Sequence, residues 1–138
     1  MSVESTRAAM GRYWDDDDLE VVADDAVYTL THSRREIRGR EEVRRFLEDF
    51  YQRTFEAKFK VANRIVDDGR AVLEGRFIGR HIGDFEGIAA TNREVDVPIC
   101  VVYELENDQI KRVRVFLQAA ALRDQLGVSG APERIATG

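Results

Sequence analysis

The spacing of apolar residues changes from a helical period to a strand period near residue 58, and this change limits the possible folds most. Upstream, apolar residues recur every three or four positions from Val43 to Phe55, which gives a helix one broad apolar face. Downstream, apolar and polar residues alternate as far as Gln118, and turn signals at residues 67–70 and 107–108 divide this run into successive strands. Helices followed by consecutive strands predict an α+β fold in which the helices cover one face of an antiparallel sheet.

Shorter signals predict the remaining elements, and four successive aspartates mark the first boundary. The aspartates at residues 15–18 break one helix and cap the next. A metal site there is the less favoured alternative, because no other cluster of ligands converges on them. In chain order we predict helices at residues 4–14 and 19–23, a strand at 26–31, a loop or short strand pair at 32–40, a long helix from 40, strands at 58–66, 71–82, 94–105 and 110–118, and a helical turn at 119–126.

Length and composition limit the class of protein. A chain of 138 residues fits one domain, which we place at residues 1–127, and the Gly-, Ser-, Ala- and Pro-rich residues 128–138 predict a flexible tail. The net charge of −5 argues against nucleic-acid binding. No apolar run approaches the ~20 residues that span a bilayer, and the N-terminal residues have no signal-peptide core. We therefore expect a cytoplasmic protein with no membrane partner.

The chain has one cysteine, Cys100, so it cannot form an intrachain disulfide. Cys100 lies in an apolar run and is predicted to be a small core residue rather than a nucleophile. No Cys and His cluster has the spacing of a zinc site, and we predict no metal.

Strand parity assigns a face to each residue of the last two strands. Ile99, Val101 and Tyr103 share one face of residues 94–105, whereas Cys100 lies on the other. In the last strand Val113, Val115 and Leu117 are expected to face inward, and Arg112 and Arg114 outward. A curved sheet closed by helices leaves an internal pocket, and Tyr103 is the one polar side chain that these two inner faces offer it.

Several short segments, taken in order, resemble one family. They are residues 23–28 (ADDAVY), 39–43 (GREEV), 79–91 (GRHIGDFEGIAAT), 95–98 (VDVP) and 125–127 (QLG). The chain resembles the SnoaL-like polyketide cyclases of the nuclear transport factor 2-like superfamily, which also contains ketosteroid isomerase and limonene epoxide hydrolase. The resemblance implies a cystatin-like, cone-shaped barrel with an internal pocket, usually a homodimer. It also implies a hydrophobic polyketide, terpenoid or steroid-like substrate, and no metal or organic cofactor.

The chain departs from that family at the positions of its acid–base groups. The resembled cyclases carry Gln, His and Asp at places that fall on Ile99, Val101 and Val115, and the isomerases carry an Asp base near Leu30. All four residues are aliphatic here. Acid–base catalysis needs a titratable group within hydrogen-bond reach of the substrate. We therefore expect catalysis to depend mainly on holding the substrate folded in the apolar pocket, and less on proton transfer.

The remaining polar residues supply the candidate catalytic groups. Tyr103 is a candidate hydrogen-bond donor to a carbonyl or enolate, His32 a candidate acid or base, and Tyr28 shares the parity of Leu30. The alternatives are a packed phenol for Tyr103 and a solvent-exposed strand end for His32. Asp84 and Glu86 are expected to cap the turn of their glycine-rich loop, and contact with a ligand is the alternative.

The predicted ligand-binding residues lie on the helices and strands that are expected to face the pocket. Tyr13 and Trp14 end the first helix and either pack in the core or contact ligand, and His81 either lines the pocket edge or holds the following loop. The predicted ligand-binding residues are Tyr13, Trp14, Leu30, Phe46, Phe50, Tyr51, Phe77, His81, Ile99, Val101, Val115 and Leu117.

Two functions from different classes remain open, and a third is less favoured. The first is a small cyclase or isomerase of secondary metabolism that binds a polyketide- or terpenoid-like substrate and promotes ring closure by holding it folded. The second is a non-catalytic carrier for an apolar metabolite, which the same aliphatic positions favour. The third is an interaction protein that pairs through the open sheet face carrying Arg112 and Arg114.

Overall fold

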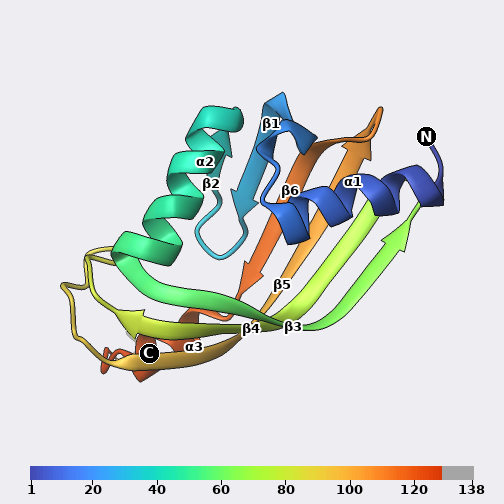
Figure 1. Cartoon of the computed structure of the whole chain (residues 1–138). Coiled ribbons are helices and arrows are strands. Elements are labelled where there is room, and N and C mark those ends of the chain that lie inside the picture. The colour runs from blue at the N-terminus through green and yellow to red at the C-terminus, as the bar shows by residue number, and fades with distance from the viewer. Residues whose placement is uncertain (129–138) are drawn as a thin grey trace.

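Six strands form one sheet that curves around the interior of the molecule (Figure 1). The structure is a computed structural model and describes residues 1–128, so the predicted flexible tail lies outside the described residues apart from Val128. The order across the sheet is β2-β1-β6-β5-β4-β3. The strands are β1 (Val22–Leu30), β2 (Arg35–Arg38), β3 (Phe55–Asp67), β4 (Arg70–His81), β5 (Glu94–Glu106) and β6 (Gln109–Leu117).

The α+β prediction is confirmed, but the prediction of a purely antiparallel sheet is wrong. β1 pairs with β6 in parallel, with Tyr28 beside Val113 and Leu30 beside Val115, whereas the other pairs are antiparallel. Alternation of apolar and polar residues looks the same in either direction, so the sequence pattern could not reveal this orientation. The cone is also open rather than a closed barrel, since β2 and β3 are the two edges of the described sheet.

Two helical segments lie on the inner side of the sheet (Figure 1). α1 (Val3–Asp16) packs on β3 and β4, and α2 (Arg40–Glu48) packs on β1 and β2. A π-helical turn, η2 (Asp49–Thr54), continues α2, and a short helix, α3 (Ala119–Gln125), packs on β5. No helix within residues 1–128 combines the length and apolar character needed to cross a membrane.

The boundaries near the aspartate run differ from those predicted. Asp18 caps as expected, because its carboxylate accepts a hydrogen bond from the Glu20 backbone N–H at 3.0 Å. The helix that it caps is only the 3₁₀ turn η1 (Leu19–Val21), and β1 begins four residues before the predicted residue 26. For residues 32–40 the sequence left open a loop or a short strand pair. Residues 35–38 form the strand β2.

Curvature of the sheet depends on a close approach between β3 and β4. A methyl group added at Gly75 would lie 2.1 Å from the backbone oxygen of Lys60 and 2.7 Å from the Phe59 ring. The register also shifts between Val61 and Asn63, where β3 carries an irregularity. Missing side chains and bulges let strands bend sharply, which makes the sheet concave toward the helices.

The face assignments from parity are confirmed in β5 and β6. Ile99, Val101 and Tyr103 are buried on the inner face, and Phe116 is 45% exposed on the outer face. Cys100 pairs opposite Phe116 and is half-buried. The prediction of a buried core position for this cysteine is therefore wrong, because Cys100 lies on the outer face beside the exposed Phe116.

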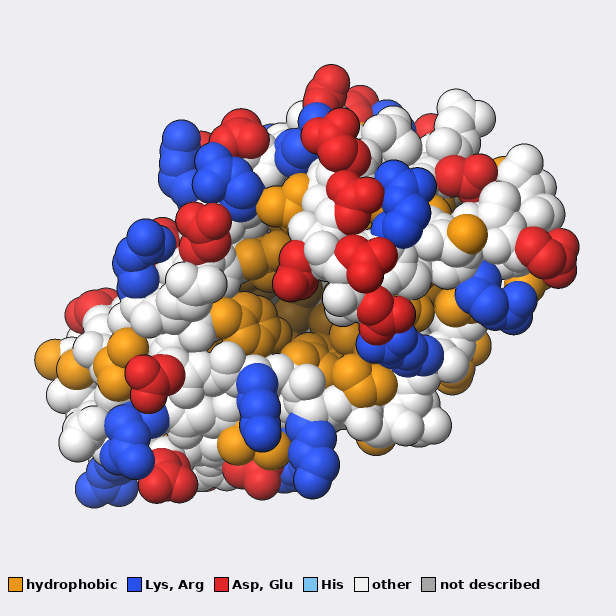
Figure 2. Space-filling view, in the orientation of Figure 1, with side chains coloured by type: hydrophobic (Ala, Val, Ile, Leu, Met, Phe, Trp, Pro, Cys, Tyr) orange, Lys and Arg blue, Asp and Glu red, His pale blue; other side chains and the backbone are white. Residues whose placement is uncertain are grey.

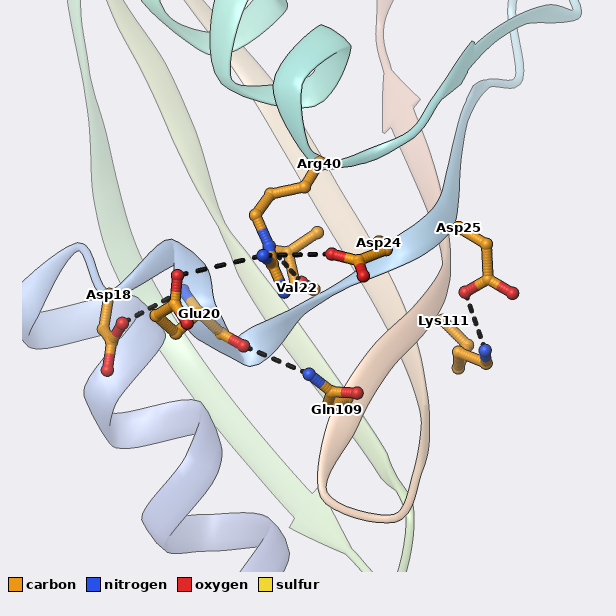
Figure 3. Close-up of polar contacts among 8 residues, drawn as sticks. All are labelled: Asp18, Glu20, Val22, Asp24, Asp25, Arg40, Gln109 and Lys111. Atoms are coloured by element: carbon orange, nitrogen blue, oxygen red, sulfur yellow. Dashed lines mark hydrogen bonds and ion pairs between the residues drawn. The ribbon is translucent and has the colours of Figure 1, made fainter.

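One arginine joins two of the sequence segments that resemble the family (Figure 3). Nε of Arg40, the first residue of α2, donates a hydrogen bond to the backbone oxygen of Val22 at 2.7 Å. Its guanidinium also lies 3.0 Å from the carboxylate of Asp24 and 3.8 Å from that of Glu20. The side chain of Arg40 is only 23% exposed. The start of α2 is thereby fixed to the start of β1.

We expect Arg40→Ala to lower the free energy of unfolding by about 1–3 kcal/mol, because it leaves the backbone oxygen of the buried Val22 without its charged donor. Urea denaturation measures this change. The matched control is Arg44→Ala, which removes the same charge from an exposed pair of partners, Glu41 and Glu48, and should change stability little. Equal losses in the two variants would contradict a special role for the Arg40 contacts.

Candidate functional site

The inner face of the sheet and the helices α1 and α2 enclose a cavity of about 1040 Å³ that opens to solvent. Figure 2 shows a hollow in the centre of this face, with hydrophobic side chains inside it and acidic and basic side chains around it. Cavities of this size accommodate molecules as large as a typical drug. The predicted internal pocket is therefore present.

All but two of the predicted site residues line this cavity. Residues far apart in the sequence meet there because the curved sheet and the two helices converge on it. The predicted residues that line it are Tyr13, Trp14, Tyr28, Leu30, His32, Phe46, Phe50, Tyr51, Ile99, Val101, Tyr103, Val115 and Leu117.

Phe77 and His81 lie behind the cavity wall. Phe77 is fully buried, with its ring centroid 4.8 Å from that of Phe50. His81 is also fully buried, and its Nδ1 accepts a hydrogen bond from the backbone N–H of Thr91 at 3.1 Å. Burial lowers the pKa of His81, which favours the neutral imidazole. Of the two alternatives for His81, the geometry fits the one in which it holds the following loop.

An aliphatic wall is formed by the residues onto which the sequence resemblance places the acid–base groups of related proteins. Val101 lies opposite Val115 across β5 and β6, and Ile99 lies opposite Leu117. Leu30 extends the wall onto β1, beside Val115. These neighbours form one continuous apolar surface, which excludes water from the bound part of a ligand.

Every tyrosine of the chain lines the cavity, and so does its single tryptophan. The hydroxyl oxygens of Tyr13 and Tyr28 lie 2.6 Å apart, so one phenol donates to the other. The ring of Tyr103 packs edge-on against Tyr13 and Trp14, with centroids 5.9 and 5.7 Å away. The π-helical turn carries the fourth phenol, Tyr51, toward the same space.

Burial keeps these phenols protonated. It raises the pKa of Tyr13 to about 12, although the hydrogen bond with Tyr28 acts in the opposite direction. Burial also raises the pKa of Tyr28, Tyr51 and Tyr103 above the ordinary value of a tyrosine. A protonated phenol can donate a hydrogen bond to an oxygen that gains negative charge, but it is a poor proton acceptor.

His32 lines the cavity near its mouth and is not the solvent-exposed histidine of the alternative prediction. Its side chain is 15% exposed, and its Nε2 lies 2.7 Å from a carboxylate oxygen of Glu86. Asp84 caps its turn as predicted, since it accepts a hydrogen bond from the Gly87 backbone N–H at 3.0 Å. Glu86 was expected to do the same, but it instead reaches His32 from the loop.

Sequence reasoning missed part of the wall and most of the charged rim. Leu73 shares the parity of Phe77 in β4, so the alternation there could have identified it. Phe85 lies in an irregular loop and carries no periodic signal. The other missed lining residues include Leu19, Ile37, Phe59 and Arg35.

Solved structures share this fold at low sequence identity. A protein from Jannaschia sp. CCS1 named as a SnoaL-like polyketide cyclase has a TM-score of 0.78 and 21% identity, and the match covers 94% of each chain. A protein from Xanthomonas campestris pv. campestris named as a polyketide cyclase has a TM-score of 0.76 and 17% identity, covering 89% of this chain and 97% of that one. A protein from Kribbella flavida DSM 17836 named as a ketosteroid isomerase has a TM-score of 0.62 and 19% identity, and the match covers 83% of this chain and 78% of that one.

A comparison with curated proteins gave no match. The family model described as SnoaL-like polyketide cyclase matches residues 6–126, which is nearly the whole described chain. The open cone and its cavity agree with that match. The chain therefore belongs to the SnoaL-like polyketide cyclase family.

Proposed function

We propose that this protein binds an apolar, carbonyl-bearing molecule of the polyketide or terpenoid type and promotes its cyclisation or isomerisation. Family membership supports a reaction of this general type. The observation that carries the proposal is that all four tyrosines and the one tryptophan line a single cavity together with the aliphatic side chains of β1, β5 and β6. Polar-tipped aromatic side chains suit a ligand that is mostly apolar and carries a few oxygens.

The aliphatic wall supplies the positioning. A flexible substrate folded against Ile99, Val101 and Val115 loses most of its freedom before the bond forms, so the entropic part of the barrier falls. The same wall keeps water away from the reacting atoms. The proposed contribution of these residues is therefore orientation, not proton transfer.

The tyrosine phenols supply the electrostatic stabilisation of the substrate in the proposed reaction. Either member of the Tyr13–Tyr28 pair can donate to the other, and the one that accepts keeps its own O–H for a ligand. Tyr51 and Tyr103 line the same cavity, so their O–H groups can also donate to a ligand there. A phenol donor held beside a substrate carbonyl stabilises negative charge as it develops on that oxygen.

The first test compares two ligands that differ in one oxygen, 2-acetylnaphthalene and 2-isopropenylnaphthalene. We expect the ketone to bind about fivefold more tightly, because one hydrogen bond contributes roughly 1 kcal/mol. Quenching of Trp14, the only tryptophan, reports binding inside the cavity, and calorimetry gives the affinity. In a Tyr103→Phe and Tyr13→Phe double variant the preference for the ketone should shrink.

Two controls accompany this test. Val101→Trp fills the cavity and should weaken both ligands, whereas Phe116→Ala alters an exposed outer residue and should affect neither. Equal binding of the two ligands in every variant would contradict the phenol-donor proposal. Absence of binding by both would contradict the cavity proposal itself.

The second test separates an enzyme from a carrier. A linear poly-β-ketone ester is incubated with the protein, and its cyclised products are measured by liquid chromatography and mass spectrometry. An enzyme should raise the rate or alter the product ratio relative to buffer, and Val101→Trp should abolish that effect. Recovery of the bound ester at the background rate would instead favour the carrier, which the aliphatic residues Ile99, Val101 and Val115 also suit.

The protonated phenols predict a stability loss in alkali. In the unfolded chain tyrosines ionise near their ordinary pKa of 10.0. In the folded chain burial raises the pKa of Tyr13 to about 12. Above pH 10 the unfolded state therefore binds fewer protons than the folded state, and the free energy of unfolding falls as pH rises. Below pH 10 this contribution is constant.

Urea denaturation between pH 8 and about 11.5 measures this slope, and absorbance at 295 nm measures tyrosinate. The folded protein should show little tyrosinate at pH 10, and Tyr28→Phe should reduce the slope. Half-complete ionisation of the folded protein at pH 10 would contradict the predicted burial of the phenols.

The homodimer and the cytoplasmic location remain predictions. Sedimentation velocity tests the first. A monomer at micromolar concentration would contradict it without affecting the cavity.

A further inference from the structure

His32 is held at the boundary between the cavity and the loop that carries Glu86. It follows β1, where the backbone N–H and the hydroxyl of Thr31 both donate to the carbonyl of Val115, at 3.1 and 3.0 Å. The backbone N–H of Ser33 donates to Leu30 at 3.2 Å. The residues on both sides of His32 are therefore fixed by hydrogen bonds, and its side chain lines the cavity.

The two nitrogens of this imidazole have different surroundings. Nε2 lies 2.7 Å from Oε2 of Glu86, and an ionised carboxylate only accepts hydrogen bonds, so Nε2 carries the proton. In the neutral ring Nδ1 is then a bare lone pair. This Nδ1 is buried and has no hydrogen-bond partner within residues 1–128. Buried polar atoms are rarely left without a partner, which calls for a reason.

Glu86 is itself held by its loop. Phe85 on one side is buried, and its backbone exchanges hydrogen bonds with Ile88 at 2.9 and 2.8 Å. Asp84 accepts from Gly87 across the turn. Glu86 adopts a left-handed backbone conformation with φ 49°, which is uncommon for residues other than glycine. The loop thus holds the carboxylate in a defined place relative to His32.

We propose that His32 is the proton-accepting residue of the cavity, with Nδ1 as the accepting atom and Glu86 as the residue that positions the ring. This inference rests on the proposed function. The aliphatic wall and the protonated phenols lack a proton acceptor, and carboxylates that line the cavity, such as Asp17, Glu42 and Asp84, are exposed to solvent. His32 is the one imidazole that lines the cavity in the described structure. A carboxylate behind the ring fixes its tautomer and stabilises the imidazolium that forms.

The proposed step balances as follows for a ketone. Nδ1 takes a proton from the carbon next to the carbonyl, and the C–H electron pair forms the carbon–carbon double bond of an enolate. The carbonyl π pair moves to oxygen, which receives hydrogen bonds from tyrosine hydroxyls. In an isomerisation the imidazolium returns its proton to another carbon of the same molecule. In a ring closure the enolate carbon attacks a second carbonyl, and the proton goes to the resulting alkoxide.

A purely structural contact that only holds the Glu86 loop, here called a clasp, would show the same His32–Glu86 hydrogen bond. The test must therefore separate this structural role from that of a proton acceptor. His32→Gln keeps an amide N–H that can donate to Glu86, but it has no basic nitrogen. A clasp survives this change, whereas a base does not. Glu86→Gln keeps the loop and removes the charge behind the ring.

The experiment measures hydrogen–deuterium exchange at the carbons next to the carbonyl of 2-tetralone in D₂O, by NMR, with the full chain. We expect the protein to accelerate exchange, and His32→Gln to lose at least tenfold of kcat with little change in KM. Imidazole added to His32→Ala should restore part of the rate. Glu86→Gln should lower kcat to an intermediate value. The control Glu94→Gln removes the same charge from an exposed pair with Arg80 and should keep the wild-type rate.

Exchange by His32→Gln at the wild-type rate would overturn the proposal and leave the residue as a clasp. If this variant still binds 2-acetylnaphthalene and cyclises the poly-β-ketone ester normally, the proposed function stands and only the base assignment fails. If no protein-dependent exchange is seen although 2-tetralone binds, His32 is not a base and the proposal also fails. If neither ketone binds the wild type, both proposals fail together.

The tautomer of His32 gives a second test, because a ring flipped so that Nδ1 faces Glu86 would carry its proton on the other nitrogen. The chain has two histidines, so ¹⁵N-histidine spectra contain two imidazoles, and His32→Gln assigns them. We expect protonated Nε2 and unprotonated Nδ1 for His32, and a mixture of tautomers in Glu86→Gln. A proton found on Nδ1 in the neutral ring would contradict the assignment of the accepting atom.

Discussion

The parallel pairing of β1 with β6 is the contact on which the rest of the structure depends. It joins the N-terminal helices and strands to the antiparallel strands of the C-terminal half. Thr31 reinforces its end with two hydrogen bonds to the Val115 carbonyl. Because of this pairing, Tyr28 and Leu30 lie beside residues of β6 and face the same interior as Tyr103. Without it, the sheet would end at β6 and one wall of the cavity would be missing.

Burial in this interior determines which chemistry its residues can perform. Taking a phenol out of water disfavours its anion, so the tyrosines remain donors rather than bases. Charged side chains stay at the rim, where water solvates them. The burial of His32 is intermediate between these two groups, since its side chain is 15% exposed and is paired with a half-exposed carboxylate. In the proposed function the tyrosines stabilise charge on oxygen inside the cavity, and His32 accepts a proton beside Glu86.

The accuracy of the sequence predictions follows the range of the interactions behind them. Asp18 capping and the turn at residues 67–70, where Gly69 has a left-handed φ of 71°, depend on a few neighbouring residues and were predicted correctly. The inner face of Ile99 and Val101 follows from period-two alternation, which is also local. The direction of β1 relative to β6 depends on the whole chain path, and alternation carries no directional information.

By itself, the sequence determined the α+β class, the inner and outer faces of the late strands, and the aliphatic character of the wall. These properties follow from residue type and spacing, which act over a few positions. Only the tertiary structure decided that Phe77 lies behind the wall, that Tyr13 pairs with Tyr28, and that Glu86 reaches His32 across 54 positions of sequence. Alternation tells which face a side chain occupies, but depth and partner depend on sheet curvature and chain path, which only the folded structure specifies.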